Sequence, residues 1–147
     1  MATVFSKIIA GEIPGRFVWA DDVCVAFLTI EPITDGHCMV VPREEIEQWT
    51  DASEQTWAHL TSVARTIALA QQAEWECPRV GLLLEGFLVD HLHVHTWPAF
   101  SPEDFDPHAT KTDVPAEELD AAAQRLRQRL RAMGHAERVV PAGPLAR

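Results

Sequence analysis

The chain has 147 residues, of which 47% are hydrophobic and 23% charged, as expected for one soluble globular domain with a substantial core. Its 22 acidic residues outnumber its 12 basic residues, so the formal net charge at pH 7 is -10. This charge opposes sequence-independent binding to nucleic acid polymers or anionic membranes, because both need a basic surface. It does not exclude a small phosphate ligand, which a few local donors can hold.

Cysteine usage and hydropathy indicate the cellular compartment in which the protein is expected. Cys24, Cys38 and Cys77 are scattered and form no Cys-x-x-Cys pair, which predicts free thiols in a reducing environment. The first 15 residues lack a basic segment followed by a long apolar run, which predicts no signal peptide. No segment approaches the roughly 18 apolar residues of a membrane span. We therefore expect a cytoplasmic protein.

The first half of the chain predicts two helices and three strands. Thr3 can cap a short helix that ends at Gly11. Residues 16–20 and 23–29 are expected to form a hairpin, and residues 37–41 a third strand that ends before a proline. Asp51 and Glu54 resemble a capping box at the start of a long amphipathic helix, which runs to about residue 73.

The second half predicts two more strands and a third helix. Residues 80–85 and 88–97 are expected to be strands joined by a tight hairpin at 85–87. After a loop, a helix is expected over about 115–133. We therefore predict an α+β fold, a five-stranded antiparallel sheet with a long helix, a short N-terminal helix and a C-terminal helix. This single domain would span residues 1–134, with a tail at 135–147 that is loosely ordered or docked on a partner subunit.

The most informative stretch is Asp90 to Pro98, in which His91, His93 and His95 alternate with Leu92 and Val94. On a strand the three imidazoles would share one face, with the apolar side chains on the other. Three imidazoles on an interior face are costly unless each is hydrogen-bonded or bound to a ligand. The pattern therefore indicates chemistry more than packing.

Two kinds of chemistry fit this pattern. One is metal chelation by His-x-His, although a closed metal site usually takes ligands from a second element. The other is nucleophilic catalysis by a neutral imidazole, in which one ring nitrogen attacks while the other donates its proton to a fixed acceptor.

Four segments together resemble one family. His91 to Trp97 resembles the histidine-triad (HIT) motif His-φ-His-φ-His-φ-φ, where φ is apolar, with Thr96 as a departure. VFSKIIAGEIP (4–14), DDVCVAF (21–27) and GHCMVVPREEI (36–46) resemble the family's opening helix, hairpin and His-bearing strand. The resemblance covers roughly residues 3–98. It is to the nucleoside phosphoramidase and dinucleoside polyphosphate hydrolase branch of the HIT family.

The resemblance implies a reaction and a set of roles. The middle histidine, here His93, would attack the α-phosphorus of a nucleoside phosphoramidate, dinucleoside polyphosphate or aminoacyl-adenylate-like compound, and water would resolve the nucleotidyl-histidine. His95 would hydrogen-bond the phosphate or leaving group and help supply its proton, His91 would brace the site, and His37 would orient the nucleophile. The side chains expected to hold the purine-type nucleoside are Val4, Phe5, Ile8, Phe27 and Thr29.

The resemblance further implies a homodimer through the long helix and the sheet edge, and no cofactor or metal. The sequence departs from the family at three places: Thr29 replaces a ribose-binding Asp, Phe87 stands where Gln is expected, and Thr3 and Ser6 replace a zinc-binding Cys pair. No structural zinc is expected in this protein, because the hydroxyls of Thr3 and Ser6 are poor substitutes for two thiolates. The alternatives are a non-catalytic nucleotide-binding module and a metal-binding protein that uses the strand histidines.

Overall fold

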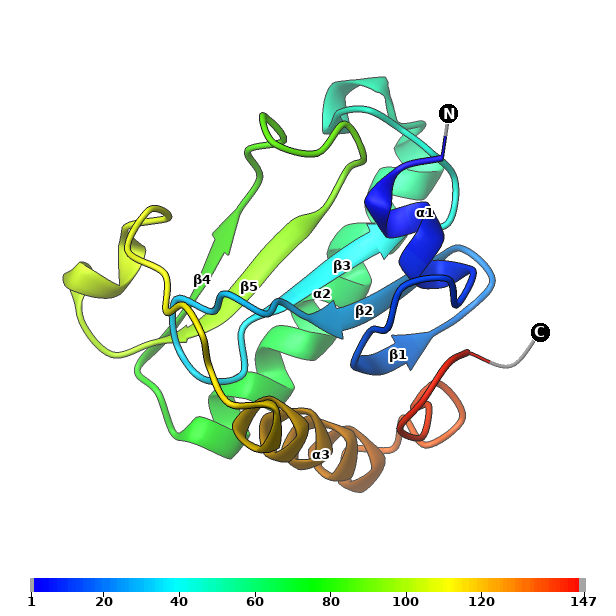
Figure 1. Ribbon diagram of the computed structural model, residues 1–147. Helices are drawn as coiled ribbons and strands as arrows, with labels where there is room; N and C mark the ends of the chain where they lie inside the picture. The colour runs from blue at the N-terminus through cyan, green and yellow to red at the C-terminus, as the bar shows by residue number, and fades with distance from the viewer. Residues whose placement is uncertain (1, 146–147) are drawn as a thin grey trace.

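The computed structural model describes residues 2–145 and contains a five-stranded sheet with three α-helices (Figure 1). The strand order is β1-β2-β3-β5-β4, and every neighbouring pair is antiparallel. This confirms the predicted fold class. The strands are β1 (Phe17–Ala20), β2 (Cys24–Leu28), β3 (Cys38–Pro42), β4 (Arg79–Leu83) and β5 (Val94–Ala99). The helices are α1 (Val4–Ile9), α2 (Glu54–Trp75) and α3 (Ala116–Ala132), with short 3-10 turns at Trp49–Asp51 and Pro102–Phe105.

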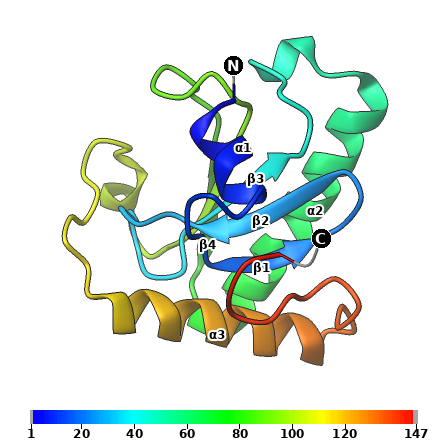
Figure 2. The same ribbon diagram turned by 45° about the vertical axis from the view of Figure 1, so that its right-hand side comes forward.

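The strand alternation divides the core between the two faces of the sheet. In β2, Ala26 and Leu28 face the cluster beneath α2 and α3, whereas Val25 and Phe27 pack on the opposite face with Phe5 of α1. Figures 1 and 2 show α2 and α3 on one side of the sheet and α1 on the other. The face beneath α1 is only partly covered, because α1 has six residues. The uncovered part of this face leaves room for a cavity.

The start of α2 differs from the prediction. Ser53, not Asp51, is the N-cap, and its side chain accepts a hydrogen bond from the Thr56 backbone N–H. An N-cap residue needs extended backbone, which Ser53 has, whereas Asp51 lies inside a 3-10 turn. The predicted capping box at Asp51 and Glu54 is therefore wrong. The helix runs to Trp75, two residues beyond the predicted end.

The predicted tight hairpin at 85–87 is also wrong. β4 ends at Leu83, which pairs with His95, so residues 84–93 form a long irregular loop rather than a turn. The Leu92 backbone N–H donates to the Ile46 carbonyl at 2.7 Å, so this part of the loop pairs with the segment after β3. Of the three motif histidines, only His95 lies within β5.

The described part of the tail, residues 135–145, packs against this chain. The Arg138 carbonyl accepts a hydrogen bond from the Ala20 backbone N–H, and the His135 ring lies 5.6 Å from the Trp19 ring. Residues 146–147 of the expected tail lie outside the described residues. The prediction of free thiols is confirmed for all three cysteines, each of which is buried. Across residues 2–145, the helices are too short or too polar to cross a membrane.

Candidate active site

A cavity of about 560 Å³ lies between α1, the start of β3 and the loops after β2 and β4. Three of the four predicted catalytic histidines, His37, His93 and His95, line it, while His91 is fully buried behind them. The predicted nucleoside-binding residues also line it: Val4, Phe5, Ile8, Phe27 and Thr29. The structure therefore brings three of the four histidines and the residues of the predicted pocket together around one largely apolar hollow.

The ring of His93 has its tautomer set by its neighbour in the chain. Its Nδ1 lies 2.6 Å from the backbone carbonyl oxygen of His91, and because a carbonyl can only accept, Nδ1 carries the proton. Nε2 then holds a free lone pair. Burial lowers the pKa of His93 below its ordinary value, and the nearby carboxylate of Glu85 offsets part of this effect. The ring is therefore neutral near pH 7, as a nucleophile must be.

His37 and His95 form a second hydrogen-bonded pair. The Ile33 backbone N–H donates to His37 Nδ1 at 3.0 Å, so the His37 proton is on Nε2, which donates to His95 Nδ1 at 2.8 Å. His95 consequently carries its proton on Nε2. Burial is the main cause that lowers the pKa of His37 to about 3 and of His95 to about 4, and each also has a histidine neighbour that disfavours its charge. Although His37 was expected to orient His93, its hydrogen bond goes to His95.

His91 connects the triad to the N-terminal helix. Its Nε2 donates to the Pro42 carbonyl at 2.8 Å, which leaves Nδ1 to accept from the Thr3 hydroxyl at 2.6 Å. The same Thr3 oxygen accepts from the Ser6 backbone N–H and so caps α1, as predicted. The sequence identified Thr3 as a cap but not as a partner of His91. No local pattern reveals this contact, since 88 residues separate the pair.

The Thr3–Ser6 positions do not fit the structural zinc of some HIT proteins. The Ser6 hydroxyl donates to the Glu45 carboxylate, while the Thr3 hydroxyl is committed to His91. Both oxygens are neutral and already hydrogen-bonded, whereas structural zinc sites are built from thiolate and imidazole ligands. The two hydroxyls at these positions therefore serve hydrogen bonds of the protein.

A smaller cavity of about 270 Å³ adjoins the first and shares Glu85, Gly86, Phe87 and His93 with it. Its wall carries the acidic side chains of Glu47, Glu85 and Asp90 together with the ring of Phe87, which is 86% exposed. The sequence analysis gave these acids no role: Asp90 directly precedes the triad, whereas nothing in the spacing of Glu47 and Glu85 places them beside it. The Phe87 ring offers no hydrogen-bond donor where the family pattern has an amide.

The geometry does not favour a metal at the triad. Within residues 2–145, the triad nitrogens do not bring three ligand atoms within 4.8 Å of one another. His91 also uses both ring nitrogens in hydrogen bonds to protein oxygens. The triad therefore presents the Nε2 lone pair of His93 beside the Nε2–H of His95, and not a closed set of metal ligands.

Comparisons with known proteins agree with this arrangement. A model of the HIT domain matches residues 10–101. An uncharacterized HIT-like protein of Saccharolobus solfataricus is 33% identical over 120 residues, 78% of this chain and 84% of that protein. The protein named hit of Bacillus subtilis is 30% identical over 135 residues, 86% of this chain and 93% of that one. A crystal structure of a hypothetical histidine triad nucleotide-binding protein from Sulfolobus tokodaii superimposes with a TM-score of 0.75 at 27% identity, covering 88% and 92% of the two chains. The chain belongs to the HIT domain family.

Proposed function

We propose that this protein binds a purine-type nucleotide and cleaves it at the α-phosphate through a nucleotidyl-histidine intermediate on His93. The observation that carries the proposal is the tautomer of His93. Its Nδ1–H is held by the His91 carbonyl at 2.6 Å, so a lone pair on Nε2 is available at the cavity wall. An imidazole held in this way is a competent nucleophile.

The roles of the other groups follow from the same hydrogen bonds. The nucleoside would occupy the apolar hollow beneath Phe5 and Phe27, with its α-phosphate at His93. Nε2 of His93 forms the bond to phosphorus while the bond to the leaving atom breaks, and the electron pair stays on that atom. His95 presents its Nε2–H beside the nucleophile, where it hydrogen-bonds a phosphate oxygen or the leaving atom. Water then hydrolyses the nucleotidyl-histidine, which yields the nucleoside monophosphate and the free enzyme.

The charge of the second cavity affects which leaving group the site can accept. In an in-line displacement the leaving atom lies opposite Nε2 of His93 across phosphorus. A leaving group that extends from there into the second cavity, which adjoins the first, would meet Glu47, Glu85 and Asp90. A polyphosphate there would be repelled by like charges, whereas an amine would not. Among the substrates that the family resemblance implies, the site therefore supports a nucleoside phosphoramidate or an aminoacyl-nucleotide better than a dinucleoside polyphosphate.

The test replaces His93 with Asn, which keeps some size and hydrogen bonding but removes the nucleophile. We expect His93→Asn to bind AMP within a few-fold of wild type and to lose turnover of adenosine phosphoramidate by at least about three orders of magnitude. Acid quench of the wild type should trap an acid-labile nucleotidyl-protein adduct, which the variant lacks. His135→Asn is the matched control, since its ring contacts Trp19 and lines neither cavity. Near-normal turnover by His93→Asn contradicts the assignment.

A second candidate function is a nucleotide-binding module without turnover. Two residues favour it. Thr29 offers a hydroxyl where the family pattern has a carboxylate, and its oxygen already accepts from the Glu31 backbone N–H. Phe87 likewise supplies no donor for the phosphate. Wild-type protein that binds AMP, turns over no phosphoramidate and forms no adduct would establish this function instead.

A further inference from the structure

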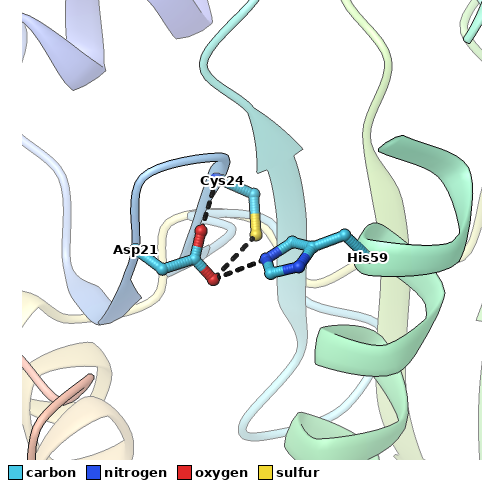
Figure 3. A group of neighbouring side chains, drawn as sticks. All are labelled: Asp21, Cys24 and His59. Carbon is cyan, nitrogen blue, oxygen red and sulfur yellow. Dashed lines mark hydrogen bonds and ion pairs between the residues drawn. The ribbon is translucent and has the colours of Figure 1, made fainter. Parts of the chain in front are cut away.

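A second group of chemically active side chains lies at the turn between β1 and β2. Asp21 belongs to this turn, Cys24 is the first residue of β2, and His59 reaches them from α2 (Figure 3). Asp21 and Cys24 are buried, and His59 is partly exposed. None of the three lines either cavity at the triad. The group is therefore independent of the proposed catalytic site.

The imidazole of His59 and the thiol of Cys24 both approach one carboxylate oxygen of Asp21. Asp21 Oδ2 lies 2.8 Å from His59 Nε2 and 3.7 Å from Cys24 Sγ, and the three potential ligand atoms all lie within 4.8 Å of one another. Tetrahedral zinc with bonds of about 2.0–2.3 Å holds its ligand atoms roughly 3.3–3.7 Å apart. The sulfur and oxygen thus already have the required separation. Relative to the carboxylate oxygen the imidazole needs to withdraw by only about half an ångström. Relative to Sγ, from which it lies at most 4.8 Å, it needs to approach by about 1 Å at most. Its side chain is 39% exposed.

The carboxylate is held in place by other donors. Asp21 Oδ1 accepts from the backbone N–H groups of Val23 and Cys24, both at 2.8 Å, and Oδ2 accepts from the Trp19 indole N–H at 2.9 Å. Although burial alone would raise it, these donors and His59 lower the pKa of Asp21 to about 2. Hydrogen bonds that orient a ligand in this way are the usual surroundings of protein metal sites.

We propose that Asp21, Cys24 and His59 bind one thiophilic divalent cation of the Zn²⁺ type, with water as the fourth ligand. Binding releases the thiol proton to solvent and moves the proton of His59 from Nε2 to Nδ1. The carboxylate and the thiolate then balance the two charges of the cation. Because the thiol must lose its proton on binding, only a cation with high affinity for thiolate is expected to bind here. Mg²⁺ and Ca²⁺, which prefer oxygen ligands, are not expected to bind.

The probe is Co²⁺, whose bond to a thiolate gives a charge-transfer band in the near ultraviolet. Untagged protein treated with a chelator is titrated with Co²⁺, and Zn²⁺ is then added as a competitor. We expect the band to saturate at one equivalent, to disappear with Zn²⁺ and to be absent from Cys24→Ser. His59→Gln should weaken Co²⁺ binding at least about tenfold, because it removes one of three protein ligands. Cys77→Ser and His135→Gln are the matched controls and should keep the wild-type titration.

The outcomes separate this site from the triad. His93→Asn should leave the band unchanged, since the triad contains no thiol. If Cys24→Ser does not fold, His59→Gln still decides the question, because its side chain is partly exposed on the surface of α2. A wild-type titration without a thiolate band at one equivalent overturns the proposal. A band that survives Cys24→Ser, or that His59→Gln leaves as tight as in wild type, overturns it as well.

Discussion

The positions of the protons on the triad histidines are set by backbone groups, each of which can act only as a donor or only as an acceptor. The His91 carbonyl can only accept and the Ile33 N–H can only donate, so the protons of His93 and His95 are fixed on opposite ring nitrogens. From the sequence, the alternating histidines were predicted to include a nucleophile, and a nucleophilic imidazole needs a fixed acceptor for the proton on its other nitrogen. The sequence could not identify the acceptor, because every residue has a carbonyl and only the irregular backbone at 91–93 aims this one at His93.

Thr3 is expected to be a positioning residue for the nucleophile. Thr3→Val removes the α1 cap and leaves the buried Nδ1 of His91 without a partner, which costs about 1–3 kcal/mol. If His91 shifts, its carbonyl no longer holds His93, and kcat on adenosine phosphoramidate should fall by about tenfold or more, with KM changed less. Thr3→Ser keeps the hydroxyl and should rescue kcat to within about two-fold, which a role of the methyl group in packing would not predict. Steady-state kinetics with a wild-type kcat in Thr3→Val would contradict this role.

If His93 is the nucleophile, as proposed, the pH dependence of catalysis follows from the neutral state of the buried histidines. Burial lowers the pKa of His93 below 6.5, so the reactive neutral ring persists at pH values where an exposed histidine is protonated. We expect the acid limb of the kcat/KM profile to fall below pH 6.5, and activity to be lost only as the pH drops further, toward the lowered pKa. A profile of kcat/KM against pH from 4 to 9 checks this. An acid limb centred above 6.5 would show that the ring is less buried than described.

At the scale of elements, the local patterns predicted the type and order of the strands and helices better than their ends. The hydrophobic run through Leu88 and Val89 resembles a strand, but these residues have no partner strand in the sheet, because β4 ends at Leu83. Leu92 instead bonds the carbonyl of Ile46, a contact 46 residues away that no local pattern encodes. The predicted cap at Asp51 was wrong for a different reason: Ser53, two residues later, is also a good cap type, so residue type alone does not decide where α2 begins.

Gly36 is expected to control how α2 meets the start of β3. Its φ is +87°, and an added Cβ would lie 2.6 Å from the ring of Trp75 on α2. Its carbonyl also accepts from the buried side chain of Gln71. Gly36→Ala should therefore carry both backbone strain and a clash with a packed ring, and lower the free energy of unfolding by about 2 kcal/mol or more.

Gly86→Ala provides the control for Gly36→Ala. Gly86 has a similar φ of +80°, but an added Cβ would meet nothing within 4 Å. Its cost should be limited to backbone strain of about 1 kcal/mol. Urea unfolding of the two variants compares them directly. Equal losses of stability would mean that the packing of Trp75 against Gly36 contributes nothing beyond the strain at positive φ.

At the scale of the whole molecule, the sheet has two unequal edges. The β1 edge is covered by the described tail, which bonds Ala20 through the Arg138 carbonyl. β4 forms the other edge, with Leu82 56% exposed on it and Leu69 40% exposed on the neighbouring helix α2. The sequence predicted an interface at the sheet edge and long helix only through the family resemblance. The structure adds which edge strand and which side chains are available for it.

We expect two copies of the chain to associate through β4 and α2. An edge strand with unpaired backbone groups and exposed leucines is a surface that soluble proteins usually cover. Light scattering at micromolar concentration should therefore report a dimer. Leu82→Lys places a charge in the middle of this edge, and its desolvation on association should weaken the dimer by at least about tenfold, so that monomer accumulates.

Gln128→Lys is the matched control, because it adds the same charge at an exposed position of α3, which packs against β1 at the opposite edge. Wild-type protein that is only monomeric would contradict the dimer. If the Leu82→Lys and Gln128→Lys variants dimerise equally well, β4 does not form the interface, because the lysine at position 82 would then remain in solvent.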